Sequence, residues 1–473
     1  MDDRTKEAVT RELVEVLGET KVFSRVSDLI PYTKDTYQIR FDEEYKYLPD
    51  FVVLPGSTEE VQEVVRIAAR HKAPIIPKGG GSNRTGMLVP LTGGIVIDTI
   101  KMNKVIEVNV SDLCATVQPG ITLAELDQHL ARFGVSLHQV QGSFKVATVG
   151  GSISTSGFSR KHQKYGSISD RVMSLEVVLA NGRVLRTGPK VLYTSTGYRL
   201  HEMFIGAEGT LGVITEATLR IEPLPEARDA VLAFYDDFRA AKEAGIRLMR
   251  SCLTYAGAEA YETDDATEWG APKGKVGVFY VTLEGLRGEV ESEKAFIEKL
   301  VAETGGIQAS QEIAEKLLDR YAKQFCGARA LIGAEDTITC YLPIDQIDEF
   351  YEIFWGTIMP KYGLKPVPGE ALSLDVGKYR ILGARYFIPK SEEGWNDYQK
   401  ALREIAELAT RLGGSISACH GVGIEHRDNL DLEYSEVALD TMREIKRMFD
   451  PDNLMNPGKK LPERKRGRIN ESI

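Results

Sequence analysis

Three glycine-rich segments are the parts of this sequence best suited to bind an anion. They read KGGGSNRTG at 78–86, TVGGSISTSG at 148–157 and GAEGTLG at 206–212. Consecutive glycines and small hydroxyl residues let the backbone approach a ligand closely, and concave arrays of backbone N–H groups bind anions. None of the segments matches the G-x-G-x-x-G or the G-x-x-x-x-G-K-[ST] pattern. Together they predict a site that could hold a cofactor pyrophosphate without a lysine.

The elements around these segments alternate between strands and helices. A short apolar strand precedes Ser57 and Glu60, which have the spacing of a helix-capping pair. Another strand at 73–77 leads directly into the first glycine-rich segment, and Thr122 and Glu125 repeat the capping spacing. This order predicts a mixed α/β domain.

The chain changes character after residue 166 and again after residue 222. Asn181-Gly182 between two apolar runs predicts a β-hairpin. Pro223 and Pro225 then interrupt the chain. Strands separated by amphipathic helices follow, which predicts a second α+β domain.

Composition narrows the function classes. The 473 residues include 59 Lys and Arg and 69 Asp and Glu, a net charge of −10, which argues against nucleic-acid binding. We find no signal peptide and no run of about 18 apolar residues, so no membrane span is expected. The five cysteines lack C-x-x-C spacing, which excludes a recognisable thiolate zinc or iron–sulfur site and favours a reduced, cytoplasmic protein. The basic tail at 464–468 is expected to be solvated.

The order of motifs along the chain resembles one family. PGSTEEVQEVVRIA, PKGGGSNRTG, ATVGGSIS with KYGSISDRV, GAEGTLGVITEATLRI and FDPDNLMNPGK are similar to segments of the FAD-linked oxidases of the vanillyl-alcohol-oxidase class. More narrowly, they resemble the glycolate-oxidase-subunit and D-lactate-dehydrogenase group. The resemblance implies an α+β fold: a two-lobed FAD-binding domain at 1–222, an α+β cap domain at 223–412, and a C-terminal segment at 413–473 that returns to the FAD domain.

The resemblance also implies which residues bind the flavin. They are Pro77, Gly79, Gly80, Gly81, Ser82, Asn83, Thr85 and Gly86 in the first segment, Thr148, Gly150, Gly151, Ser154, Gly157, Tyr165 and Gly166 in the second, Gly206, Glu208, Gly209, Gly212, Val213 and Ile214 in the third, and Asn456 near the C-terminus. Some relatives attach FAD through a histidine in the first segment. This segment has none, so noncovalent FAD is expected, and His162 is expected at the surface.

His420 lies in GSISACHGVG at 414–423, which resembles the family's Glu-His-Gly-[Ile/Val]-Gly. In that family the histidine takes the proton of the substrate hydroxyl as a hydride leaves for flavin N5. An imidazole suits this task because its unperturbed pKa is about 6.5, and its small neighbours leave room for a ligand. The resemblance therefore implies that His420 is the catalytic base.

The chain departs from the metal-dependent members of the family at all three ligand positions. Those members carry a glutamate before the histidine and two histidines upstream, in Gly-His-x-Gly-Asp-Gly-Asn-x-His. Here Cys419 takes the glutamate position, and the upstream segment LGARYFIP at 382–389 has no histidine. The joint absence predicts a site without a metal.

Other side chains must then anchor the substrate. Arg385 could pair bidentately with a carboxylate or a phosphate, and Tyr386 could donate a hydrogen bond. Arg320 and Arg329 are weaker candidates. We count Arg385 and Tyr386 with His420 as the expected catalytic set.

The expected function is that of an FAD-dependent dehydrogenase or oxidase acting on the CH–OH group of a small D-2-hydroxy acid, such as lactate or glycolate. The alternative is a flavoenzyme without net redox, because Ser417 to Gly423 also matches Ser-x-x-His-Gly-Val-Gly of the alkylglycerone-phosphate synthases. Those synthases have further histidines where this chain has Ala418 and Cys419. A flavin-binding subunit without its own turnover is a third option. Electrons would leave to oxygen, a quinone, or a separate iron–sulfur or flavoprotein partner, and a homodimer is left open.

Overall fold

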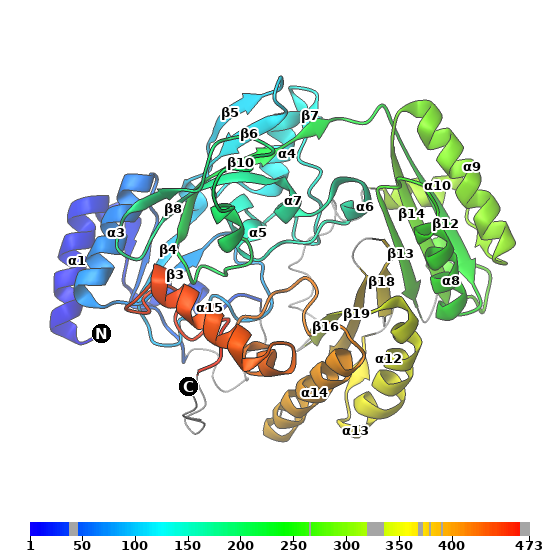
Figure 1. Ribbon diagram of the computed structural model, residues 1–473. Coiled ribbons are helices and arrows are strands. Elements are labelled where there is room, and N and C mark those ends of the chain that lie inside the picture. Colours follow the sequence, from blue (N-terminus) through cyan, green and yellow to red (C-terminus); the bar gives the residue numbers. More distant parts are fainter. Residues whose placement is uncertain are drawn as a thin grey trace.

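The computed structural model describes residues 1–36, 46–263, 266–318, 335–367, 372–377, 380–388 and 391–463. The N-terminal half forms two lobes, and a larger sheet with its helices lies beside them as a cap (Figure 1). Arg320, Arg329 and the basic tail lie outside the described residues. None of the helices within the described ranges is both long and apolar enough to cross a membrane.

The first lobe is built on a four-stranded sheet that is parallel except at one edge. In spatial order its strands are β1 (Val22–Phe23), β2 (Phe51–Val53), β4 (Ile95–Asp98) and β3 (Ile75–Lys78). Helices α1 (Asp3–Leu17) and α3 (Thr58–His71) lie together beside it (Figure 1). The predicted start of α3 is confirmed, because the Ser57 hydroxyl accepts a hydrogen bond from the Glu60 backbone N–H at 3.3 Å. The first glycine-rich segment follows β3 and so leaves the carboxyl edge of the parallel strands.

The second lobe is a five-stranded antiparallel sheet. In spatial order its strands are β5 (Val105–Asn109), β6 (Cys114–Val117), β10 (Val213–Arg220), β8 (Val172–Val178) and β9 (Val184–Arg186). The predicted hairpin at Asn181-Gly182 joins β8 to β9, with Gly182 at a φ of +74°. Helix α4 (Leu123–Ala131) begins with the predicted capping box of Thr122 and Glu125. The second glycine-rich segment forms α5 (Val149–Ser154).

The cap is one large antiparallel sheet whose main path has seven strands. In spatial order they are β15 (Ile307–Gln308), β12 (Ala227–Tyr235), β14 (Gly277–Gly285), β13 (Gly257–Glu262), β18 (Leu372–Asp375), β19 (Ile381–Phe387) and β16 (Glu335–Tyr341), and β17 (Lys365–Pro366) pairs with β19. Its main hydrophobic core is shared with α8 (Phe238–Met249), α9 (Arg287–Glu303), α12 (Ile347–Ile353) and α14 (Glu392–Arg411). A smaller cluster includes Ala314 of α10 (Gln311–Leu317).

The remaining α-helices and strands of the described ranges are short. They are α2 (Val26–Leu29), α6 (His162–Tyr165), α7 (Ile168–Arg171), α13 (Met359–Lys361), β7 (Val135–Ser136) and β11 (Glu222–Pro223). Strand β11 pairs with β7 of the second lobe and ends at the first of the two prolines that interrupt the chain.

The last segment of the chain returns from the cap to the lobes. Asn456 donates its backbone N–H to the Ile75 carbonyl at 2.7 Å, and Met455 belongs to the core of the first lobe. Helix α15 (Glu436–Phe449) lies between these contacts and the cap (Figure 1). On this helix Leu439 is buried, whereas Met448 is 69% exposed.

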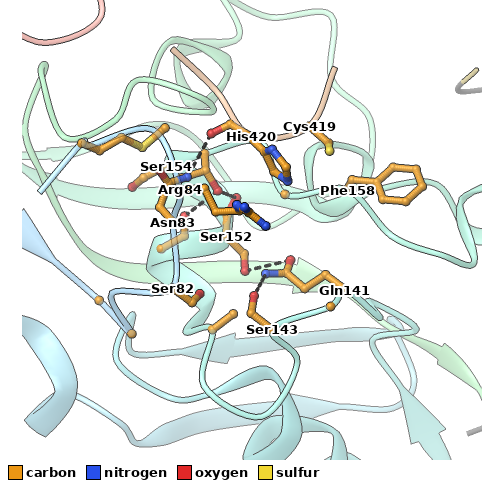
Figure 2. Close-up of a pocket in the computed structure, with 18 of the residues that line it drawn as sticks. Ser82, Asn83, Arg84, Gln141, Ser143, Ser152, Ser154, Phe158, Cys419 and His420 are labelled. Atoms are coloured by element: carbon orange, nitrogen blue, oxygen red, sulfur yellow. Dashed lines mark hydrogen bonds between the residues drawn. The ribbon is translucent and has the colours of Figure 1, made fainter. Parts of the chain in front are cut away.

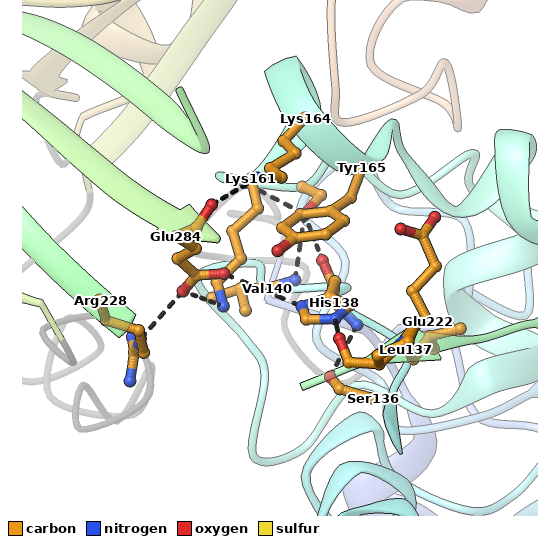
Figure 3. Close-up of polar contacts among 12 residues, drawn as sticks. Ser136, Leu137, His138, Val140, Lys161, Lys164, Tyr165, Glu222, Arg228 and Glu284 are labelled. Carbon is orange, nitrogen blue, oxygen red and sulfur yellow. Dashed lines mark hydrogen bonds and ion pairs between the residues drawn. The ribbon is translucent and has the colours of Figure 1, made fainter. Parts of the chain in front are cut away.

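A buried carboxylate of the cap pairs with a lysine of the second lobe (Figure 3). Glu284 of β14 is 1% exposed, and its carboxylate pairs with Lys161 Nζ at 2.6 Å and with Arg228 Nε at 2.9 Å. Beside it, the His138 ring stacks on the Tyr165 ring with centroids 3.9 Å apart. Burial, and next the charge of Lys161, lowers the pKa of His138 to about 4. The imidazole at this junction is therefore neutral at pH 7.

Candidate active site

A cavity of about 300 Å³ lies where the two lobes, the cap and the 413–423 segment meet. All three glycine-rich segments line it, together with strands of the cap sheet, Cys419 and His420. Side chains from separate parts of the chain, including Asn83, Gln141 and His420, gather around this space (Figure 2). The sequence segments singled out for their chemistry therefore converge on one site.

The first two glycine-rich segments are in such close contact that side chains are excluded between them. A Cβ atom on Gly80 would lie 1.9 Å from the Val146 carbonyl oxygen, and one on Gly79 would lie 2.2 Å from Thr148 Oγ1. These contacts are far shorter than atoms allow. Part of the glycine requirement thus comes from the neighbouring loop, not only from a ligand.

The two segments differ in how their backbone N–H groups are used. In the second, Gly150 donates to the Pro119 carbonyl at 2.8 Å and Gly151 to Thr148 Oγ1 at 3.2 Å. In the first, no described residue accepts a hydrogen bond from the backbone N–H groups of 80–82. The first segment therefore provides the donors that fit an anionic group such as a pyrophosphate.

Fifteen of the residues in the expected flavin-binding set line the cavity. They are Pro77, Gly79, Gly80, Gly81, Ser82, Asn83, Thr148, Gly150, Gly151, Ser154, Gly157, Glu208, Gly209, Val213 and Ile214. The others are not in the lining: Thr85, Gly86, Tyr165, Gly166, Gly206, Gly212 and Asn456.

Two residues of the expected flavin-binding set, Glu208 and Asn456, hold the lining together through hydrogen bonds. The Glu208 carboxylate accepts hydrogen bonds from the backbone N–H groups of Val422 and Gly423 at 2.8 and 2.9 Å. Asn456 donates its side-chain amide to the carbonyls of Met87 and Glu208 at 3.1 and 2.7 Å. The third segment and Asn456 thus position the loop that carries the expected base.

His420 lies in the cavity lining, on a loop that is bonded to both halves of the molecule. Asn83 of the first glycine-rich segment donates its amide to the His420 carbonyl at 2.9 Å. On the other side, Ala418 donates its backbone N–H to the Thr339 carbonyl of β16 at 2.9 Å. These contacts hold the imidazole between the flavin-loop segments and the cap.

One face of the cap sheet forms the opposite wall of the cavity. Its contributions alternate along each strand: Thr337 and Thr339 on β16, Ser373 and Asp375 on β18, and Ile381, Gly383 and Arg385 on β19. Successive side chains of a strand point to opposite faces, so every second residue reaches the cavity. Arg385 is therefore in the lining, as the sequence suggested.

The same alternation corrects the expectation for Tyr386. Its side chain is fully buried on the other face of β19, and its hydroxyl donates to Asp336 Oδ2 at 3.3 Å. Tyr398 donates to the same oxygen at 2.8 Å. Tyr386 cannot donate to a substrate in this arrangement, because two adjacent strand residues cannot face the same ligand.

Asp336 links this buried group to the cavity. It lies 3.6 Å from the guanidinium of Arg84, which is in the lining. Burial opposes ionisation, but Arg84 and hydrogen bonds from Tyr398 and Glu425 hold the pKa of Asp336 below its ordinary value. The pKa of Glu425, buried next to Asp336, is well above its ordinary value because of burial and the neighbouring carboxylate. Asp336 is thus ionised opposite Arg84, while Glu425 keeps its proton.

No group of three or more His, Cys, Asp or Glu side chains among the described residues is arranged to hold a metal ion. Burial raises the pKa of Cys419 to about 11, which makes its thiol a poor ligand at neutral pH. The metal-free site stays a prediction.

The surface position expected for His162 is wrong: the side chain is 0% exposed, and its Nδ1 lies 3.0 Å from the Ser159 carbonyl oxygen.

Sequence reasoning missed several lining residues, among them Arg84, Phe158, Arg160 and Asp375. Arg84 stands inside the first glycine-rich segment, so its position alone could have identified it. The cap residues carry no local signal, because which strand face reaches the cavity depends on long-range strand pairing.

Two family models match the chain. The FAD binding domain matches residues 49–188, and the C-terminal domain of FAD linked oxidases matches residues 384–460. These ranges contain the first two glycine-rich segments, Arg385 and His420. The residues of the cavity fit FAD. The first glycine-rich segment offers backbone N–H donors for an anionic group, and its glycines have no side chains that would project into the cavity.

The chain is also similar to characterised relatives along almost its whole length. It is 31% identical to a D-lactate dehydrogenase of Archaeoglobus fulgidus over 92% of this chain and 97% of the relative. It is 27% identical to the glycolate oxidase subunit GlcD of Bacillus subtilis over 98% of each chain. In fold it is similar to p-cresol methylhydroxylase, with a TM-score of 0.81 at 19% identity over 97% of each chain. Together, these findings show that the chain belongs to the FAD-linked oxidase family and that it is an FAD-dependent oxidoreductase.

Proposed function

We propose that the protein oxidises a small D-2-hydroxy acid, such as lactate or glycolate. The observation that carries this proposal is that His420 and Arg385 line the same cavity as the three glycine-rich segments. A base and a carboxylate-binding cation are the two groups that a 2-hydroxy acid requires. The names of the two relatives, a D-lactate dehydrogenase and a glycolate oxidase subunit, support the same substrate class.

Each residue has a distinct task in this proposal. The His420 imidazole accepts the proton of the substrate hydroxyl, and Asn83 sets the position of its backbone. The planar Arg385 guanidinium offers parallel N–H donors to the substrate carboxylate. FAD, when bound, supplies the acceptor for the hydride that leaves the substrate carbon. A cytoplasmic location and a separate electron acceptor stay predictions.

An anaerobic substrate panel tests the proposal. FAD-loaded protein is mixed with D-lactate, L-lactate, glycolate and D-2-hydroxyglutarate, and flavin absorbance is followed. We expect at least one of these acids to bleach the flavin. If none does, the proposal is wrong. If the protein instead converts an acyl-dihydroxyacetone phosphate and a fatty alcohol without net flavin reduction, the synthase alternative is correct.

Replacing the base gives the second arm of the test. His420→Asn should slow flavin reduction by about 10²- to 10⁴-fold, which is the usual contribution of a positioned base. FAD content should stay unchanged, since the contact to Asn83 uses only the backbone of residue 420. Undiminished reduction in this variant would refute the role of His420.

A further inference from the structure

Two carboxylates face each other across neighbouring strands at the cap wall of the cavity. Strands β13 and β18 are antiparallel, and Glu259 is the direct cross-strand partner of Asp375. Both residues are 5% exposed. Two like charges in such a position repel each other strongly, and burial removes the water that would screen them.

Arg160 bridges the two carboxylates. Its Nη1 contacts Glu259 Oε1 and lies 3.2 and 3.5 Å from the two carboxylate oxygens of Asp375. One guanidinium group therefore contacts two carboxyl groups that lie against each other. Two carboxyl groups this close favour a state in which one of them holds a proton, because two ionised carboxylates repel each other.

The proton belongs with Asp375, whose side chain faces the ligand. Asp375 lines the cavity with Arg160, whereas Glu259 does not. Burial, with the opposing effects of Arg160 and Glu259, raises the pKa of Asp375 to about 8. The Cys419 thiol also lies close to Asp375, and burial raises the pKa of this thiol to about 11, so it is neutral at this pH. Arg84, Arg385 and His420 line the same cavity.

We propose that Asp375 carries a proton shared with Glu259 and donates it as a hydrogen bond to an anionic oxygen of the bound substrate. Asp375 is then a specificity-determining residue of the cap wall, and Glu259 is the positioning residue that keeps it protonated. The inference rests on the proposed function, since it adds a second anchor for the acid that Arg385 binds. A protonated Asp375 favours substrates that place a hydrogen-bond acceptor oxygen at this wall and disfavours substrates that place a hydrogen-bond donor there.

Infrared spectroscopy of the FAD-loaded protein tests the proton itself without any substrate. We expect the wild type to show a protonated carboxyl band at pH 7 that is lost as the pH passes about 8. Asp375→Asn should lose that band. Glu259→Gln should also lose it at pH 7, because Arg160 then faces a single carboxylate. Subtracting variant from wild-type spectra removes the band of protonated Glu425. If neither variant changes the band, Asp375 holds no proton and the proposal is overturned.

Binding of oxalate, an anion without a hydride to transfer, tests the donor role. The wild-type Kd should weaken about tenfold or more between pH 6 and pH 10, as expected for losing a hydrogen bond to a charged group. Asp375→Asn keeps an N–H donor and should bind with a Kd that does not change with this titration. Glu259→Gln should bind weakly already at pH 7.

A purely structural ion pair predicts another result: both variants would bind oxalate alike, with the pH dependence of the wild type. That result, or a wild type that does not bind oxalate at pH 6, overturns the donor role. The panel distinguishes this failure from that of the proposed function. If hydroxy acids bleach the flavin while the oxalate and infrared tests fail, the function stands and only the role of Asp375 is lost.

Discussion

Adjacent residues of one strand have separate tasks in this protein. Arg385 and Tyr386 both belong to β19, yet one lines the cavity and the other is buried against Asp336. The motif LGARYFIP indicated both residues as substrate contacts. Strand geometry allows only one of them, so the sequence could identify the pair but not the face.

This separation gives a prediction for two neighbouring variants. Arg385→Met should raise the KM for a reactive hydroxy acid on the order of 100-fold, because a bidentate pair with the carboxylate is lost. Tyr386→Phe should leave KM unchanged and lower the free energy of unfolding by about 1 kcal/mol, through loss of the hydrogen bond to Asp336. Steady-state kinetics and denaturant unfolding measure the two effects. A large KM change in Tyr386→Phe would contradict the buried position of its hydroxyl.

At the scale of elements, the first glycine-rich segment is shaped by its neighbour as much as by its ligand. We predict that Gly80→Ala lowers both FAD affinity and stability, since its Cβ would lie 1.9 Å from the Val146 carbonyl oxygen. Overpacking of this kind typically costs about 1–3 kcal/mol. Flavin titration and thermal unfolding measure the effect. Gly288→Ala is the control, because nothing lies within 4 Å of its Cβ. Equal behaviour of the two variants would contradict the close packing of the loops.

The junction between the cap and the second lobe is expected to weaken in acid. The pKa of His138 is lowered to about 4 in the folded protein, against about 6.5 when unfolded. Between these values the unfolded chain binds a proton that the folded protein does not, so stability falls as the pH falls. The contribution of His138 between pH 7 and pH 5 is about 2 kcal/mol.

Unfolding at pH 7 and pH 5 checks this dependence. His138→Asn should lose less stability between the two pH values than the wild type does, and asparagine tolerates the φ of +55° at this position. Some acid sensitivity should persist, because burial also lowers the pKa of His426 to about 4. An unchanged pH dependence in the variant would show that His138 accepts a proton freely in the folded state.

Local signals in the sequence identified many elements correctly. The start of α3, the capping box of α4 and the hairpin at Asn181-Gly182 all depend on residues within a few positions of each other. The cap sheet does not: β18 pairs with β13, more than a hundred residues earlier in the chain. Its register decides that Asp375 faces Glu259, and no local pattern encodes that pairing.

For the molecule as a whole, we predict that catalysis requires no metal. Dialysis against a chelator should leave flavin reduction by the panel acids unchanged, and elemental analysis should find less than stoichiometric zinc and manganese. The physical basis is the neutral thiol of Cys419 and the absence of histidine from the upstream segment LGARYFIP at 382–389. One tightly bound metal ion per chain, whose removal stops flavin reduction, would refute this prediction.

The fold class and the cofactor could be predicted from the sequence, because motifs for both occur in order along nearly the whole chain. The place of His420 in the cavity lining could be too, since this residue stands in a recognisable segment. The cavity wall opposite the glycine-rich segments could not, because Arg84, Arg160 and Asp375 are brought together by contacts between the lobes and the cap. This wall is therefore the part of the site that most needs three-dimensional information.

The loop from Ser415 to Gly423 is hydrogen-bonded to the cap at one end and to the lobes at the other. The position of the His420 backbone therefore depends on how the cap packs against the lobes. A mutation that loosens this junction far from His420 would also shift the imidazole, and the effect of such a mutation and the effect of a ligand that holds the two parts together would be linked by thermodynamic reciprocity.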